Sequence, residues 1–148
     1  MFEGKKSSPT KHYQYSTPEK RSEGIDRFVK QVTQVQAMKA AYKANLDKPH
    51  TLQVGQIVHS SWGYDQTQND FYKIIELKGK TRVVLQQLQI RKVDGSTGHM
   101  SCSVMPVLDE NIGEPFTKKA NGLNQIKLTS YASASLWDER PKYQSWYA

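Results

Sequence analysis

The segment Ser60–Thr67, with the sequence SSWGYDQT, gathers aromatic, amide and carboxylate side chains around one glycine, and Asp70-Phe71-Tyr72 follows it closely. Aromatic rings stack on nucleic-acid bases, and amides and carboxylates read base edges. The same side chains also suit a protein-binding hot spot. The simpler interpretation is that the rings pack in or around the core while the polar residues brace the loop. The candidate binding residues of this segment are Trp62, Tyr64, Asp65, Gln66 and Tyr72.

The same segment offers one enzymatic alternative. Asp65 and Asp70 flank the connection and His59 precedes it, so the three side chains could hold a divalent metal or activate water. Their spacing matches no established metal motif, and the sequence has no Walker A loop, GxGxxG, HExxH or CxxC pair. We therefore expect no catalytic residues, no metal site and no cofactor, with a metal-dependent enzyme centred on this loop as an alternative.

Lysines form the second group of candidate binding residues. The net charge is +7, and residues 1–50 hold ten Lys or Arg against five Asp or Glu, whereas residues 51–148 hold eleven against nine. This asymmetry favours an anionic partner for the N-terminal part, although lysine also serves simply to keep a helix face solvated. Lysine contacts phosphates, and nearby tyrosines can stack on bases. The candidate lysines are Lys5, Lys6, Lys11, Lys118 and Lys119.

The segment also carries a family resemblance. The pattern Ser-Trp-Gly-Tyr-Asp-Gln-Thr, two further residues and Asp-Phe-Tyr, at positions 61–72, resembles uncharacterised proteins of bacteriophages and other mobile elements. A second match is Lys127–Ala132 running into Leu136–Asp138, and the resemblance extends from about Leu52 to Tyr143. It implies a phage-like or plasmid-like accessory protein and carries no known activity or catalytic residue.

The elements that position these residues begin with a polar tail and a helix. Residues 1–21 lack a periodic apolar pattern and are predicted to be a flexible basic tail. Apolar residues then recur at three- and four-residue spacing from Ile25 to Leu46, which predicts an amphipathic helix over residues 22–46 that ends before Pro49. We expect its apolar stripe to pack on the rest of the protein, with partner binding as the alternative.

Residues 51–148 have the texture of short strands. Five runs are predicted as strands: 53–61, 71–77, 81–93, 98–108 and 124–137. Turns are expected at Lys78-Gly79-Lys80 and Asp94-Gly95, and a change of phase at Gln86-Gln87 predicts a bulge. The fold expected is therefore α+β and mainly β, a small five-stranded antiparallel barrel-like domain, with residues 110–122 as its mobile loop.

Cysteine usage and hydropathy indicate the cellular compartment in which the protein is expected. The single cysteine, Cys102, allows no disulfide within the chain and is expected to be a small packed side chain. No run approaches the roughly 20 apolar residues of a membrane span, and the first residues do not resemble a secretory signal. We expect a protein of the host cytoplasm, without a membrane partner.

The function expected from these features is binding. The leading hypothesis is an accessory protein that engages nucleic acid or a host nucleoprotein complex, most concretely an inhibitor of a host defence nuclease, for example of the anti-CRISPR or anti-restriction type. A small virion or assembly protein is the structural alternative. The oligomeric state stays open.

Overall fold

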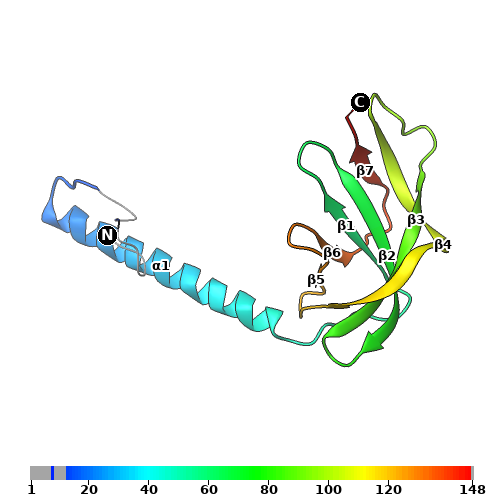
Figure 1. Ribbon diagram of the computed structural model, residues 1–148. Helices are drawn as coiled ribbons and strands as arrows, with labels where there is room; N and C mark the ends of the chain where they lie inside the picture. Colours follow the sequence, from blue (N-terminus) through cyan, green and yellow to red (C-terminus); the bar gives the residue numbers. More distant parts are fainter. Residues whose placement is uncertain (1–7, 9–12, 148) are drawn as a thin grey trace. The chain divides into compact units, whose positions relative to one another are not determined.

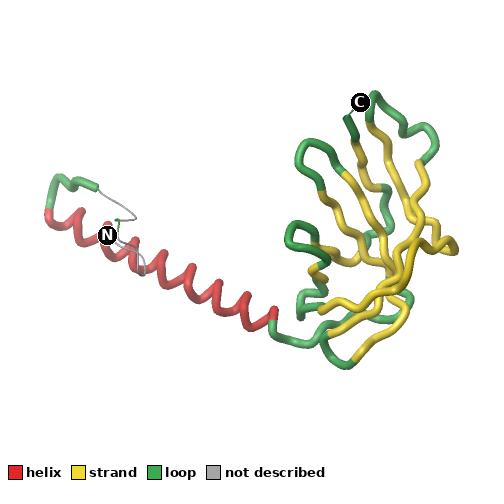
Figure 2. The backbone as a smooth tube through the Cα atoms, viewed as in Figure 1, coloured by secondary structure: helices red, strands yellow, loops and turns green. Residues whose placement is uncertain are grey.

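The protein consists of two compact units, residues up to Ala44 and residues from Asn45 onward. We call them the helical unit and the β unit and describe each by itself. The computed structural model describes residue 8 and residues 13–147. Its secondary structure in these ranges is one long helix and seven strands (Figures 1 and 2).

The helix α1 spans Pro18–Leu46. Proline suits the first turn because its missing N–H has no partner there, and the Thr17 hydroxyl accepts a bond from the Lys20 backbone N–H at 3.3 Å as a cap. The predicted end at Leu46 is confirmed, but the helix starts four residues before the predicted Ser22. The last four residues of the predicted tail are therefore helical.

Two further expectations concern the helical unit. The rest of the predicted tail falls mostly outside the described residues, so its flexibility stays a prediction. Docking of the helix on the β unit also stays a prediction, because the two units are described separately. Within the described part of the chain, no helix has an apolar stretch of the length needed to cross a bilayer.

The β unit is built on one seven-stranded antiparallel sheet. Its spatial order is β5-β6-β1-β2-β3-β4-β7, so β5 and β7 are the edges and the sheet is open. The mainly β fold is confirmed, but the expected five-stranded barrel is not. The strands are β1 (Ile57–Trp62), β2 (Gln68–Lys78), β3 (Arg82–Lys92), β4 (Ser101–Lys119), β5 (Ile126–Lys127), β6 (Ser133–Leu136) and β7 (Lys142–Ser145).

The strand count differs from the prediction at the C-terminal end. The run expected as one strand, residues 124–137, is divided into β5 and β6 by a turn in which the Ala132 backbone N–H donates to the Thr129 hydroxyl at 3.0 Å. Strand β7 was missed because its four residues are too short to show a period. The turns at Gly79 and Gly95 are confirmed, and both glycines have positive φ.

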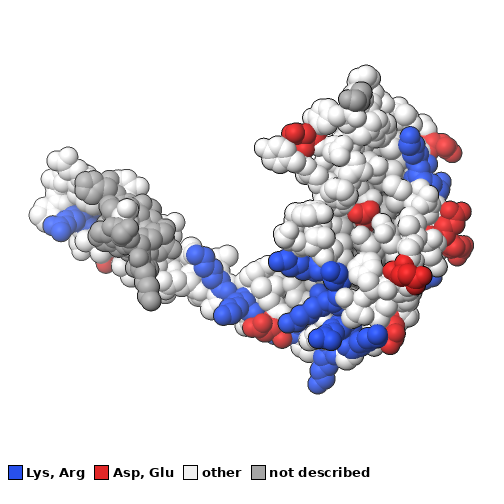
Figure 3. Space-filling model, in the orientation of Figure 1, with Lys and Arg blue, Asp and Glu red and all other residues white. Residues whose placement is uncertain are grey.

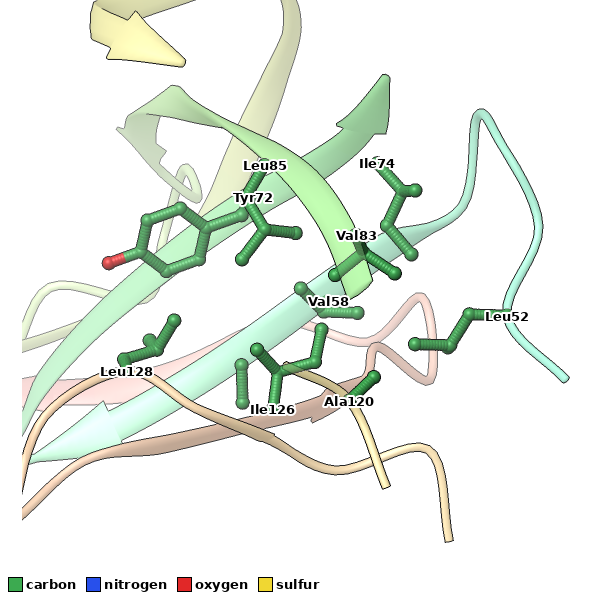
Figure 4. Packing of buried hydrophobic residues seen from close by; sticks show 10 residues of the cluster. Leu52, Val58, Tyr72, Ile74, Val83, Leu85, Ala120, Ile126 and Leu128 are labelled. Atoms are coloured by element: carbon green, nitrogen blue, oxygen red, sulfur yellow. The ribbon is translucent and has the colours of Figure 1, made fainter. Parts of the chain in front are cut away.

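The two faces of the sheet carry separate cores. Neighbouring residues of a strand point to opposite faces, so Tyr72 joins one core while Phe71 joins the other. The first core is shown in Figure 4 and includes Val58, Ile74, Leu85 and Ile126. The second core contains Phe71, Leu88, Cys102 and Val104, with Ile57, Ile90, Trp137 and Trp146 packed against it.

Strand β4 serves both cores because it is long and irregular. Leu85 pairs with Phe116 but Gln87 pairs with Ile112, and Leu88 pairs with Asn111 but Ile90 with Pro106, so β4 carries the extra residues. The predicted bulge near Gln86 is confirmed. The predicted loop over residues 110–122 is wrong: its Gly, Pro and polar residues belong to a bulged strand that continues to Lys119.

Gln86 lies inside this irregularity. Its side chain is buried, and its amide nitrogen donates to the backbone carbonyls of Ile112 at 3.0 Å and Gly113 at 3.2 Å. These carbonyls lie where β4 departs from regular pairing. The side-chain amide therefore replaces ladder bonds that the bulge interrupts.

Replacing Gln86 by Leu is expected to lower the free energy of unfolding by about 1–3 kcal/mol, because the Ile112 and Gly113 carbonyls lose the hydrogen bonds of a buried donor. Urea unfolding measures this. Gln89→Leu is the matched control, an exposed glutamine of the same strand, and should change stability by no more than about 0.5 kcal/mol. Equal effects of the two changes would show that Gln86 does not hold the bulge.

Candidate functional site

The aromatic segment found in the sequence begins where β1 ends. The Trp62 indole N–H donates to Oδ2 of Asp70 on β2 at 2.5 Å, and the Gln87 amide of β3 donates to Oδ1 of the same carboxylate at 3.2 Å. Both oxygens of Asp70 are thus engaged. The carboxylate fixes the orientation of an indole ring whose side chain remains 36% exposed.

The turn after Trp62 depends on its glycine. Gly63 has φ near +130°, and a Cβ there would collide with the Gln66 carbonyl oxygen. The Thr67 backbone N–H donates to the Ser145 hydroxyl at 3.0 Å, so β7 braces the turn. The expected bracing by Asp65 is not found, since its side chain makes no hydrogen bond within the described residues.

A third ring joins this end of the sheet from a distant part of the chain. Tyr131, between β5 and β6, lies 6.1 Å from Trp62 between ring centroids at 58°, and it is 73% exposed. Tyr64 is 99% exposed in the turn. We call Trp62, Tyr64 and Tyr131 the aromatic surface. Tyr131 went unrecognised because only the pairing of β6 with β1 places it there.

The other candidates of the segment divide between solvent and core. Asp65 and Gln66 are exposed beside Tyr64. Tyr72 is buried and its ring packs edge-on against Phe116 at 5.6 Å. Tyr72 therefore belongs to the first core, whereas the aromatic surface and the two exposed polar residues remain open to a ligand.

The structure does not assemble the three groups of the metal alternative. His59 is paired with Phe71, so its ring lies on the face opposite Asp70. The His59 Nε2 lies 2.7 Å from Oδ1 of Asn69, whose amide nitrogen donates to the Tyr143 carbonyl at 2.7 Å. Burial lowers the pKa of His59. Across the described ranges, no three His, Cys, Asp or Glu side chains are grouped to hold a metal ion.

A row of cations crosses the other end of the sheet. Lys78 of β2 is paired with Arg82 of β3, and Arg82 is paired with Lys119 of β4. Directly paired residues share a face, so the three exposed side chains form a row that we call the cation row, with exposed Lys80 in the adjoining turn. Figure 3 shows Lys and Arg gathered around this lower end of the β unit.

No acidic side chain in the described part of the chain forms an ion pair with the cation row. Among the described residues, the ion pairs are Glu23–Arg27 and Asp138–Lys142, and neither involves the row. Like charges directly opposite one another destabilise a sheet. Arg82 therefore has a like charge directly opposite it on each side, and the acid on the same face, Glu76, stands one pair further along the strands.

The lysines singled out in the sequence fall in three different places. Lys119 belongs to the cation row. Lys118, its neighbour, turns the other way and donates from Nζ to the Leu128 carbonyl at 2.7 Å. Lys5, Lys6 and Lys11 lie outside the described residues. Sequence analysis missed Lys78 and Arg82 as site residues, since only strand register aligns them with Lys119.

Comparison with known proteins adds no relative: no family model, curated protein or solved structure matches this chain.

Tyr72 gives a pH-dependent prediction. Burial, and to a lesser extent the nearby charge of Asp70, raises the pKa of Tyr72 to about 12. Above pH of about 10, an unfolded tyrosine loses its proton while folded Tyr72 keeps it. The contribution of Tyr72 to stability is thus complete below that pH and is lost as pH rises toward its folded pKa.

We expect spectrophotometric titration of the folded protein to show a late tyrosine step near the folded pKa of Tyr72. Tyr72→Phe should remove that step, whereas Tyr64→Phe, in the exposed turn, should leave it in place. A late step that persists in Tyr72→Phe would contradict the assignment.

Proposed function

We propose that this protein is a nucleic-acid-binding accessory protein that contacts phosphates through the cation row. The observation that carries the proposal is the pairing of Lys78, Arg82 and Lys119 at directly opposed positions on three adjacent strands. Strands are spaced about 4.8 Å apart, so the row spans roughly 10 Å. It presents three cations on a hydrogen-bonded sheet.

The physical case rests on charge and on rigidity. Phosphate contacts supply most of the affinity of non-specific nucleic-acid binding, through release of condensed counterions. Cations held on strands keep their spacing when the ligand leaves, so less ordering accompanies binding. Relief of repulsion within the row adds to the free energy of binding.

The aromatic surface suits a second kind of contact with the same class of ligand. An indole held in place by Asp70, beside the tilted ring of Tyr131 and the exposed ring of Tyr64, can stack on unpaired bases. This favours single-stranded nucleic acid at that end of the sheet. The cation row by itself accepts single or double strands.

A finer form of the proposal concerns the origin of the nucleic acid. The resemblance of residues 61–72 to phage and mobile-element proteins supports a target bound within a host complex, such as a defence nuclease that the protein would inhibit. Co-elution with a CRISPR or restriction nuclease loaded with nucleic acid tests this form. Failure to co-elute would leave free nucleic acid as the target.

The main experiment measures fluorescence anisotropy of labelled single- and double-stranded DNA and RNA across a salt series. Three phosphate contacts predict a slope of log K against log salt of roughly −2 to −3. A protein lacking residues 1–12 separates the arm lysines from the row without cutting into α1, which begins at Pro18. No binding at low salt by either protein would refute the proposed function.

Arg82→Glu is expected to weaken binding and reduce the salt slope by at least about one. The same change places a carboxylate between Lys78 and Lys119, so the free protein should gain about 0.2–1 kcal/mol of stability at low salt. Opposite effects on binding and folding distinguish a ligand contact from general damage.

Arg91→Glu is the matched control for this change. Arg91 is an exposed arginine of the same strand, paired with Met105 and outside the row. It should leave the salt slope nearly unchanged. Equal losses of affinity in the two variants would mean that net charge, not the row, governs binding.

A further inference from the structure

The segment before α1 folds back along the helix and forms a cavity with it. This cavity has a volume of about 570 Å³ and is lined by Tyr13 and Tyr15 of the segment and by helix residues between Lys20 and Gln31. All of these residues belong to the helical unit. Volumes of about 300–1,000 Å³ are typical of sites for small ligands.

Gly24 is the residue that lets the segment lie against the helix. A Cβ at position 24 would collide with the Tyr15 side chain, at 2.6 Å from its ring carbon Cζ. Glycine is unfavourable in the interior of a helix compared with alanine. In return, the absence of a side chain at Gly24 makes room for the Tyr15 ring. The sequence therefore specifies the wall of the cavity that the tyrosines form.

The two tyrosines meet at an angle that suits a planar ligand. Their ring centroids lie 6.3 Å apart and the rings are inclined at 64°. Tyr13 is 63% exposed, and Phe28, which is buried, also lines the cavity. A planar ring that stacks on one tyrosine can meet the other edge to face. We call Tyr13 and Tyr15 the tyrosine corner.

The charged residues that line the cavity leave one cation without an acidic partner. Arg27 is paired with Glu23 at 3.7 Å, so these two charges offset each other. Lys20 forms no ion pair within the described residues, and its Nζ lies 3.4 Å from the Ser16 hydroxyl oxygen. The net charge of the lining is therefore positive, which favours an anionic ligand.

The remaining acid of this stretch does not change that balance. Asp26 does not line the cavity but lies in a neighbouring shallow groove, which Lys30 also lines. Glu19 and Arg21, which flank Lys20 in the sequence, carry opposite charges and likewise lie outside the lining.

We propose that this cavity binds a nucleotide, with its base on the tyrosine corner and its phosphate at Lys20. Stacking on aromatic rings tolerates every base, because each base has a π-face. A lysine ammonium binds phosphate as a point charge. The choice of a nucleotide among aromatic anions rests on the proposed function. The site itself is separate from the cation row, which belongs to the β unit.

Titration of adenosine monophosphate into the full-length protein, followed by amide resonances in NMR spectra, tests the proposal. The amides of Tyr13, Tyr15 and Gly24 should shift and reach saturation, and adenosine should bind more weakly because it lacks the phosphate. Shifts confined to other residues would overturn the proposal. Equal binding of inorganic phosphate alone would also overturn it, since the tyrosine corner would then contribute nothing.

Gly24→Ala separates the cavity from the stability of the helix. The new Cβ should displace Tyr15 and weaken binding of adenosine monophosphate at least about tenfold, the size of one lost stacking contact. Helix content by circular dichroism should stay the same or rise, because alanine is the better helix former. Gln34→Ala, at an exposed position outside the cavity, should bind as the wild type does. Wild-type affinity in Gly24→Ala would contradict the proposal.

Lys20→Ala tests where the phosphate lies. This change should abolish the preference for adenosine monophosphate over adenosine. Lys30→Ala removes the same charge outside the cavity and should keep the preference. Equal loss in the two variants would mean that net charge attracts the nucleotide, against a phosphate site at Lys20.

A short single-stranded oligonucleotide of adenylate units distinguishes the two sources of such a nucleotide. If the oligonucleotide shifts the same amides and binds more tightly than the mononucleotide, the cavity holds an unpaired nucleotide of a strand. Equal affinities identify a free mononucleotide as the ligand. Arg82→Glu should leave binding of the mononucleotide unchanged, so failure of the cavity and failure of the cation row are separable.

Discussion

The buried amide of Gln86 is the contact on which the shape of the β unit depends. A regular strand of 19 residues paired with β3 would present the same face to the same core along its whole length. By bonding the carbonyls of Ile112 and Gly113, Gln86 supports β4 at the point where the strand takes in extra residues. One strand can then serve two cores on opposite faces of the sheet.

The sheet of the β unit holds the aromatic surface and the cation row apart. Trp62 is paired with Gln68 at the start of β2, and Lys78 ends that strand. At about 3.3 Å per residue, the ten residue steps from Gln68 to Lys78 extend for up to roughly 33 Å. The aromatic surface and the cation row are therefore distinct, and they lie on opposite faces of the sheet, because Trp62 shares a face with Val58 of the first core whereas Arg82 is the neighbour of Val83 of that core. The sheet fixes their separation more firmly than any loop would.

The sequence predicted the local features well and the long-range ones poorly. Apolar spacing predicted α1 and its end, and glycine turns predicted the β2–β3 and β3–β4 connections. The phase change at Gln86-Gln87 predicted a bulge, but its deeper cause is that Val83 and Leu85 face one core while Leu88 and Ile90 face the other. Polar residues, Gly113 and Pro115 made the second half of β4 look like a loop, since the solvent face of a bulged strand resembles one in composition.

The candidate site residues also divide into those that the local sequence reveals and those that only long-range strand pairing brings together. Trp62 and Tyr64 stand out locally because of their type and their glycine. Lys78, Arg82 and Lys119 are ordinary surface cations in sequence, separated by four and by 37 residues in numbering. They become neighbours only through the register of three strands, and the pairing of Arg82 with Lys119 follows the β3–β4 bulge. Tyr131 likewise needs the β1–β6 pairing, and no sequence period carries that information.

The late position of β7 in the chain has a consequence for synthesis on the ribosome. The first core is complete once Ala134 has emerged, but the second core waits for Trp146. At about 5–20 residues per second, Val104 precedes Trp146 by about 2–8 s. During that interval the first half of β4 is an unpaired edge beside exposed apolar residues. The risk of aggregation is therefore a property of the nascent chain. It ends when Tyr143 and Ser145 of β7 form hydrogen bonds with Asn69 and Thr67, which are synthesised much earlier.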